Sequence, residues 1–391
     1  MVRISIPNLP PSTGPRILTG LSVAPVPEAV AHLASFLAAG RGKTLAITGA
    51  GVSVDSGIRA YRGKEGAYSN PNYKPIFYGE LVEDSARGEM FSELESHTNH
   101  PRDWARSFLG YPPVRDALPN PTHIYIASLQ ALGLSPGLIT QNVDNLHRKA
   151  LAMLESRLGT PTGDQPPPGH AAPLGPRPIL ELHGTLARVH CLREGHEQTR
   201  DAFQSALASE NPQWDAAAKE MEETGNKPRT NPDGDVELPG ADYTTFRVPE
   251  CSVCAAHRKH NSIIKPNVVF FGETLPEGVR DASFALVENA SQLLVMGTSL
   301  ATYSAFRLIK AAREQGKPVL MISQGPSRAD GLDGVEKMER KAGPVLRAYL
   351  DEVVRTRTGP EVDAVRAVLD AGVTKRPPDV EDSREHVQYP P

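Results

Sequence analysis

The sequence predicts an α/β protein built around a parallel sheet, and three observations support this fold class. Short apolar runs without polar alternation, such as 45–48 and 293–296, are typical of strands buried on both faces. Segments with helical character separate these runs along the chain. A glycine-rich turn, Gly49-Ala50-Gly51, directly follows the first run, where a parallel strand passes into a helix.

The individual elements are predicted in the order in which the apolar runs occur. Strands are expected at 45–48, 138–140, 293–296 and 319–322, and helices at 121–132 and 304–315. Two connections rich in glycine, proline or polar residues, 158–178 and 209–243, are expected to be insertions. The tail from residue 374 has no apolar periodicity and is predicted to be disordered.

The composition limits the classes of function. The chain has 391 residues, of which 39% are hydrophobic, so it can bury a sizeable core and form two lobes. A formal net charge of −4 gives no basic footprint for nucleic acid, and no apolar run is long enough to cross a bilayer. We therefore predict a soluble protein with no nucleic-acid or membrane partner, and we leave its oligomeric state open. Its 3 cysteines favour a metal site in a reducing compartment over a disulfide framework.

Residues 1–25 are predicted to be a disordered or targeting extension. Arg3, Arg16 and several hydroxyl residues, with no acidic residue before about Gly20, fit a mitochondrial presequence. Four prolines in the same stretch would interrupt the amphipathic helix that such a signal uses. A plain disordered extension is therefore equally compatible with the sequence.

The turn that begins at Gly49 predicts a nucleotide phosphate site. Glycine has no Cβ, so backbone N–H groups at Gly49 and Gly51 can approach a pyrophosphate at a helix N-terminus. The motif alone is equally compatible with an ordinary tight turn. The assignment to a dinucleotide therefore depends on motifs further along the chain.

Four such motifs follow in order. They are Thr140-Gln141-Asn142-Val143-Asp144-Asn145-Leu146-His147, Glu181-Leu182-His183-Gly184, Lys265-Pro266-Asn267-Val268-Val269-Phe270-Phe271-Gly272-Glu273 and Gly297-Thr298-Ser299-Leu300. With the glycine turn they resemble the signatures of the sirtuin family, over a region from Thr44 to about Val345. Within that family, residues 141–144, 247–251 and 323–330 resemble the mitochondrial sirtuin-4-like branch.

The resemblance implies a Rossmann-like large lobe, a smaller zinc-binding lobe and an active site in the cleft between them. It implies a catalytic domain over 26–355, with the large lobe over about 40–150 and 265–350 and the small lobe over about 180–264. A C-terminal helix and disordered tail would follow over 356–391. The branch also implies a mitochondrial location, where the family alone would allow a cytoplasmic or nuclear one.

The activity implied by the resemblance is NAD-dependent removal of acyl groups from protein lysines. NAD would be a consumed cosubstrate, because the nicotinamide-ribose bond is cleaved and the acyl group passes to ADP-ribose. The partners would be acyl-lysine proteins. The acyl chain stays open, and so does the question of whether ADP-ribosyl transfer accompanies deacylation.

The family pattern transfers residue by residue onto this chain. His183 is the predicted catalytic base, because an imidazole accepts a proton near neutral pH. Asn142 and Asp144 are also predicted catalytic residues, because they match the family residues that hold the nicotinamide ribose and the reactive conformation. The predicted cofactor-binding residues are Gly49, Ala50, Gly51, Ser53, Ile58, Tyr61, Arg62, Gln141, Asn142, Asp144, Gly297, Thr298, Ser299, Ser323 and Gly325. The predicted substrate-binding edge is Val269, Phe270, Phe271, Gly272 and Glu273, where a peptide would add as a strand.

Two positions after the glycine turn depart from the family pattern. Arg59 stands where sirtuins have a proline that stiffens the cofactor loop, and Ala60 stands where they have an acid that helps to bind the nicotinamide amide. We expect the loss of that acid to weaken the orientation of the amide.

The metal site is incomplete in the sequence. Cys251 and Cys254 form one C-x-x-C pair, whereas Cys191 is followed three positions later by Glu194. Cys191, Cys251 and Cys254 are predicted zinc ligands, and His196, His257 or Glu194 would complete a tetrahedral shell. The alternative is three buried thiols without a metal.

Two other functions remain as alternatives to an active deacylase. A catalytically weakened module that binds NAD or ADP-ribose would fit Ala60 and the incomplete cysteine set. A hydride-transferring dehydrogenase fits poorly, because Val54 stands where a G-x-G-x-x-G motif needs its third glycine.

Overall fold

The computed structural model describes residues 20–62, 66–69, 75, 77–78, 100–159, 176–225, 231–236, 241–260 and 262–371. Most of the predicted N-terminal extension, the tail from 374 and the middle of the 158–178 insertion lie outside the described residues.

The larger part of the molecule is a six-stranded sheet in which every paired strand is parallel. Its strand order is β3-β2-β1-β7-β8-β9. The strands are β1 (Thr44–Thr48), β2 (Gly137–Thr140), β3 (Ile179–Glu181), β7 (Gln292–Met296), β8 (Val319–Ile322) and β9 (Val335–Met338). The α/β fold class is thus confirmed, and all four predicted strands are present within one residue of their expected bounds.

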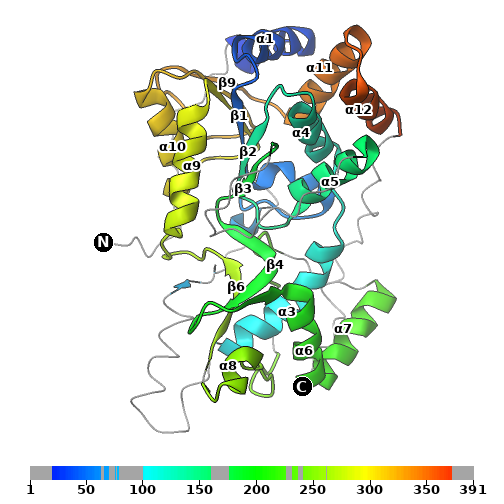
Figure 1. The fold of residues 1–391 in the computed structure, drawn as a ribbon, viewed down its shortest axis with the longest axis vertical. Coiled ribbons are helices and arrows are strands. Elements are labelled where there is room, and N and C mark those ends of the chain that lie inside the picture. The colour runs from blue at the N-terminus through cyan, green and yellow to red at the C-terminus, as the bar shows by residue number, and fades with distance from the viewer. Residues whose placement is uncertain are drawn as a thin grey trace.

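Helices cover both faces of this sheet (Figure 1). One face carries α1 (Val26–Ala39), α4 (Pro121–Ala131), α5 (Leu146–Leu158), α11 (Ala342–Thr356) and α12 (Pro360–Ala371). The other carries α9 (Glu277–Asn289) and α10 (Tyr303–Glu314). The chain therefore forms the layered arrangement that two-sided apolar strands require.

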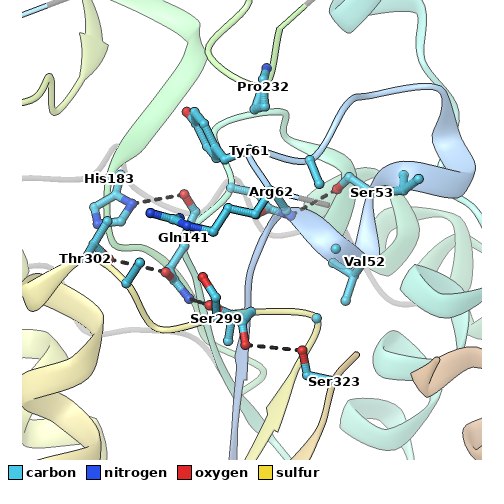
Figure 2. A pocket seen from close by; sticks show the side chains of 18 of the residues that line it. Val52, Ser53, Tyr61, Arg62, Gln141, His183, Pro232, Ser299, Thr302 and Ser323 are labelled. Carbon is cyan, nitrogen blue, oxygen red and sulfur yellow. Dashed lines mark hydrogen bonds between the residues drawn. The ribbon is translucent and has the colours of Figure 1, made fainter. Parts of the chain in front are cut away.

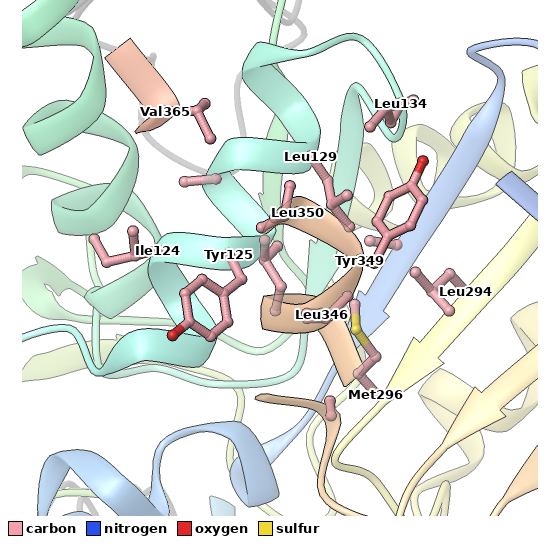
Figure 3. Packing of buried hydrophobic residues seen from close by; sticks show 14 of the residues in the cluster. Ile124, Tyr125, Leu129, Leu134, Leu294, Met296, Leu346, Tyr349, Leu350 and Val365 are labelled. Atoms are coloured by element: carbon pink, nitrogen blue, oxygen red, sulfur yellow. The ribbon is translucent and has the colours of Figure 1, made fainter. Parts of the chain in front are cut away.

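Strand β7 shows why its sequence is apolar throughout. Leu294 and Met296 pack with Leu346 and Leu350 of α11 (Figure 3), whereas Leu293 and Val295 face α9 and α10. Successive side chains of a strand point to opposite faces, so both sets must be apolar when both faces are covered.

The smaller part is built on a three-stranded antiparallel sheet of order β5-β4-β6. Its strands are β4 (Gly184–Cys191), β5 (Glu197–Thr199) and β6 (Ile264–Val268), and its helices are α3 (His100–Asp116), α6 (Arg200–Glu210), α7 (Pro212–Thr224) and α8 (Ser252–Ala256). Trp104, Phe108 and Trp214 are each 2% exposed in its core. Helix α3 thus packs with this part although it lies outside the 180–264 segment, and the exact domain bounds stay a prediction.

The strand order places the functional region. Strand β1 pairs with β2 on one side and with β7 on the other, so the order of the sheet reverses between β1 and β7. Open parallel sheets bind ligands at the carboxyl ends of the strands at such a reversal. Short 3₁₀ turns, Ala50–Val52 and Val54–Ser56, follow β1 at this point. No helix of the described residues is long and apolar enough to span a membrane.

Candidate functional site

A cavity of about 1290 Å³ opens at the carboxyl ends of the large sheet. The segments that follow β1, β2, β3, β7, β8 and β9 all contribute to its wall, and so does the segment that follows β6. It is lined by every predicted catalytic, cofactor-binding and substrate-binding residue except Gly49. The structure thus brings together residues that the sequence places up to about 275 positions apart.

The glycines of the first turn are required for a reason that the sequence did not show. A Cβ at Gly49 would lie 2.7 Å from Cβ of Thr298, and a Cβ at Gly51 would lie 2.7 Å from the carbonyl oxygen of Gly297. The N–H of Gly51 also donates to that oxygen at 2.9 Å. The turn after β1 therefore packs directly on the turn after β7, and this contact excludes side chains at both glycines.

Replacing Gly51 by alanine is expected to destabilise the protein by about 1–3 kcal/mol, because the new methyl group overlaps backbone that cannot move freely. Urea unfolding of the variant and of Gly195→Ala would measure this. Gly195 has open space around its would-be Cβ but a φ of +72°, so its variant reports the cost of backbone strain alone. Equal stability of Gly51→Ala and the wild type would contradict the contact.

Ser53, Asn142 and Asp144 form a buried hydrogen-bonded group beneath the cavity. Ser53 Oγ donates to Asp144 Oδ2 at 2.6 Å and accepts from Asn142 Nδ2 at 3.0 Å. Asp144 Oδ1 accepts from the N–H of Leu146 at 2.9 Å, at the start of α5. Burial raises the pKa of Asp144, and these hydrogen bonds oppose that shift. The three polar residues therefore connect the glycine turn, through a hydrogen bond from Asn142 Nδ2 to the carbonyl oxygen of Gly49 at 3.2 Å, to the first residue of α5.

Gln141 links the two central strands of the sheet. Its side-chain nitrogen donates to Thr298 Oγ1 at 2.9 Å and to the carbonyl oxygen of Thr48 at 3.2 Å. Its side-chain oxygen accepts from Thr302 Oγ1 at 3.4 Å. With its side chain held in this way, the backbone carbonyl of Gln141 is fixed beside His183 (Figure 2).

His183 follows β3 and is half-buried in the cavity wall. Its Nδ1 lies 3.1 Å from the carbonyl oxygen of Gln141, and its Nε2 lies 2.8 Å from Ser304 Oγ. Burial lowers the pKa of His183 to about 4. The imidazole is therefore neutral at pH 7, which is the form that accepts a proton.

The lowered pKa of His183 predicts acid sensitivity. The unfolded chain takes up a proton below about pH 6.5 and the folded chain only near pH 4, so stability falls as the pH drops through this window. We expect a loss of up to about 2 kcal/mol at pH 5 relative to pH 7 from this group. Burial also lowers the pKa of His147 to about 3 and of His190 to about 4, which adds to the trend.

Urea unfolding at pH 7 and pH 5 checks this expectation. The His183→Gln variant should show a smaller difference between the two pH values than the wild type, because one of the responsible groups is gone. An unchanged difference would mean that His183 titrates normally in the folded protein.

The segment from 265 to 273 is held by its two charged ends. Lys265 is 2% exposed and donates to Glu273 Oε1 at 2.9 Å and to the carbonyl oxygen of Val268 at 2.6 Å. Glu273 Oε2 accepts from the N–H of Phe270 at 2.9 Å. None of the expected edge residues lies in β6, because the strand ends at Val268 and residues 269–273 follow it. The carboxylate of Glu273 thus holds the predicted peptide edge in place by accepting hydrogen bonds from both Lys265 and the backbone of Phe270.

The structure adds residues to the cavity that the sequence did not single out. Pro232, in the turn after 231, lies in the wall near Tyr61 (Figure 2), and the adjacent Asp233 also lines the cavity. Arg59 Nη1 donates to Asn231 Oδ1 at 3.3 Å, which connects the loop after the glycine turn to the smaller part of the molecule.

Ser304 also lines the cavity, although the sequence predicted it only as the start of a helix. Position 60 also lies in the cavity wall, and because the residue there is alanine it offers the cavity no carboxylate.

A second site lies in the smaller part, where three cysteines meet one histidine. Ligand atoms of Cys191, His196, Cys251 and Cys254 all lie within 4.8 Å of one another. His196 follows Cys191 in the hairpin between β4 and β5, and the two are joined by a hydrogen bond from the N–H of Cys191 to the carbonyl oxygen of His196 at 2.8 Å. Of the three candidates for the fourth ligand, the structure thus brings His196 to the cysteines.

The other two candidates point elsewhere. Glu194 is exposed and pairs with Lys259 at 2.8 Å, and Nδ1 of His257 lies 2.8 Å from the carbonyl oxygen of Val253.

The spacing of the four donors fits a tetrahedral zinc ion. Sγ of Cys191 and Sγ of Cys254 are 3.7 Å apart, and His196 Nδ1 is 3.5 Å from Sγ of both Cys251 and Cys254. Zinc bonds of about 2.3 Å to sulfur and about 2.0 Å to nitrogen give tetrahedral edges of about 3.8 Å and about 3.5 Å. The donor set is therefore compatible with a structural zinc of the Cys₃His type.

Known proteins resemble this chain over most of its length. The model of the Sir2 family matches residues 49–154 and 171–304. The NAD-dependent protein deacylase SIR4 of Batrachochytrium dendrobatidis is 40% identical over 311 residues, which cover 78% of this chain and 89% of that protein. The human NAD-dependent protein lipoamidase sirtuin-4, mitochondrial, is 33% identical over 321 residues, which cover 82% of this chain and 85% of that protein.

Solved structures show the same architecture. A Sir2 protein with a deacetylated p53 peptide and 3'-O-acetyl ADP ribose matches with a TM-score of 0.53 and 25% identity, over 83% of this chain and 98% of that one.

Proposed function

This chain belongs to the Sir2 family and is an NAD-dependent protein deacylase, and from that premise we propose that His183 is its catalytic base and that the cavity holds NAD and the acyl-lysine together. The family and the sirtuin-4-like branch predicted from the motifs are confirmed by these relatives. The residue assignment rests on one observation: His183, Gln141 and the glycine turn all line the same cavity.

The cavity fits a dinucleotide in size and in the chemistry of its wall. Its volume of about 1290 Å³ exceeds the roughly 300–1,000 Å³ usual for small-molecule sites, which leaves room for a second substrate. Ser323, after β8, lines one end, whereas His183 and Gln141 line the other (Figure 2). Gly325, two residues after Ser323, also lines the cavity. The backbone of the glycine turn lies between them, at the strand reversal where open parallel sheets bind nucleotides.

The residues around His183 would supply proton acceptance and orientation. Bound NAD would provide the electrophilic ribose carbon that loses nicotinamide and receives the acyl oxygen. His183 Nε2 is the nitrogen with a lone pair and would take up the proton of a hydroxyl in the cavity. The buried group of Ser53, Asn142 and Asp144 would keep the floor of the cavity rigid, because each member is held by at least two hydrogen bonds.

Val269, Phe270 and Phe271 would form the wall along which the acyl-lysine enters. They leave β6 beside His183, since the N–H of Val269 donates to the carbonyl oxygen of His183 at 2.9 Å. The ion pair of Lys265 and Glu273 would hold this wall in shape when a peptide binds.

The test is nicotinamide release by the purified protein, measured with NAD and a panel of lysine peptides that carry acetyl, butyryl, succinyl and lipoyl groups. Release that depends on the peptide supports the deacylase and ranks its acyl groups. Binding of NAD without release with any peptide would favour the alternative of a weakened NAD-binding module, for which Ala60 in the cavity wall gives a structural reason.

We also propose a mitochondrial location. Support comes from the human and bovine relatives, whose names include that compartment. Fractionation of cells that express the full chain with a C-terminal tag tests this, and recovery in the cytosol alone would contradict it.

A further inference from the structure

Ser304 contacts the proposed catalytic base directly. It is the second residue of α10, and its Oγ lies 2.8 Å from Nε2 of His183, 121 positions away in the sequence. It is partly exposed and lines the cavity. Within the part of the chain that the structure describes, no other side chain hydrogen-bonds to the His183 ring.

The two contacts of His183 determine which of its nitrogens carries the proton. The carbonyl oxygen of Gln141 can only accept a hydrogen bond, so Nδ1 of His183 must be the donor at 3.1 Å. In the neutral ring Nε2 then has a lone pair and accepts the hydrogen bond of the Ser304 hydroxyl. The proton acceptor of the site is thus already occupied by a hydroxyl of the protein itself.

We propose that Ser304 is a positioning and proton-relay residue: its hydroxyl holds Nε2 of His183 as the acceptor and passes to it the proton of a hydroxyl in the cavity. The proposal deepens the proposed function and rests on His183 as the base. In the relay, Ser304 Oγ gives its own proton to Nε2 and takes the proton of the incoming hydroxyl. The serine ends unchanged, and the imidazole gains one proton.

The surroundings of Ser304 fix its position for this role. Helix α10 begins at Tyr303, directly after Thr302, whose hydroxyl donates to Gln141 Oε1 at 3.4 Å. Thr302, two residues before Ser304, is thus joined to Gln141, whose carbonyl oxygen is the other hydrogen-bond partner of His183 (Figure 2). The hydroxyl can turn about its Cβ–Oγ bond, so it can donate to Nε2 and accept from the cavity side without a backbone shift.

The test compares Ser304→Ala, which removes the hydroxyl, with Ser304→Thr, which keeps it. Ser205→Ala is the matched control, because Ser205 also lies in a helix but is exposed and bonds only to the carbonyl oxygen of Asp201 among the described residues. Steady-state kinetics would give kcat and KM for NAD with the best acyl peptide. Nitrogen NMR of histidine-labelled protein without NAD would report the ring nitrogens of His183, assigned by their absence in His183→Gln.

The expected result for Ser304→Ala is a kcat lowered about tenfold, as for the loss of one functional hydrogen bond, with KM for NAD within about twofold of wild type. Ser304→Thr should restore most of kcat. In the NMR spectra the Nε2 signal should move towards that of a free lone pair in Ser304→Ala, while Nδ1 stays protonated. Ser205→Ala should match the wild type in both measurements.

An unchanged Nε2 signal in Ser304→Ala would overturn the contact, and an unchanged or raised kcat would overturn the relay. The NMR measurement needs neither NAD nor turnover. It therefore separates a failure of this inference from a failure of the proposed function, which would appear as absent nicotinamide release in the wild type.

Discussion

Nicotinamide release is expected to fall by about 10²–10⁴-fold when His183 is replaced by alanine, because the site loses its proton acceptor. His183 is the only histidine among the residues that line the described cavity, so none of these can take its place as an imidazole base. Binding of NAD should change little, since the glycine turn and the Ser53 group do not depend on the imidazole. Kinetics and NAD titration on the same preparation would measure both quantities.

His32→Ala is the matched control for this experiment. His32 lies in α1 and pairs with Glu336 at 2.6 Å, away from the cavity-lining residues. Its variant should keep wild-type release. If His183→Ala keeps more than about a tenth of the wild-type rate, another group must accept the proton, and the assignment of the base is wrong.

Loss of the predicted zinc site is expected to have the largest effect on stability. Cys254→Ser should abolish zinc binding and lower the free energy of unfolding of the smaller part by at least about 4 kcal/mol, since a bound structural metal stabilises only the folded state. Cys191 and His196 belong to the β4–β5 hairpin, so a metal bound with Cys251 and Cys254 would join this hairpin to the segment at 251–254, and removal of a ligand would break that link. Metal analysis of the purified protein and thermal unfolding with and without a chelator check this.

The identity of the fourth ligand can be tested in the same series. His196→Ala should also lose zinc, whereas Glu194→Ala and His257→Ala should keep about one zinc per chain, because both side chains point away from the cysteines. Zinc retained in His196→Ala and lost in Glu194→Ala would reverse the assignment.

Local patterns were sufficient for the elements and for most of the site. The strand at 44–48 was predictable because both faces of the sheet are covered, which leaves an uninterrupted apolar run. The Gln141 motif and His183 follow the ends of β2 and β3. Residues at the carboxyl ends of parallel strands lie at one edge of the sheet, regardless of the length or conformation of the loops between the strands.

The small lobe was less predictable. Helix α3 packs there through Trp104 and Phe108, although strands β2 and β3 of the large sheet lie between it and β4 in the sequence. An apolar helical face shows that a helix is buried but not which core buries it. The course of the chain at the predicted substrate edge was not predictable from the local pattern either, because residues 269–273 lie beyond the end of β6 and Glu273 pairs back to Lys265 within the strand.

The sequence by itself determined the family, and it predicted the base and three candidate metal ligands, since these depend on residue types at fixed local spacings. Only the tertiary structure showed that His196 lies with the three cysteines, that glycine is needed after β1 to meet Gly297, and that Ser304 reaches Nε2 of His183. The reason is physical: the latter two contacts join segments far apart in the chain, and which side chains meet there is set by the packing of strands and helices. A local sequence pattern does not contain the information about which distant side chains come into contact.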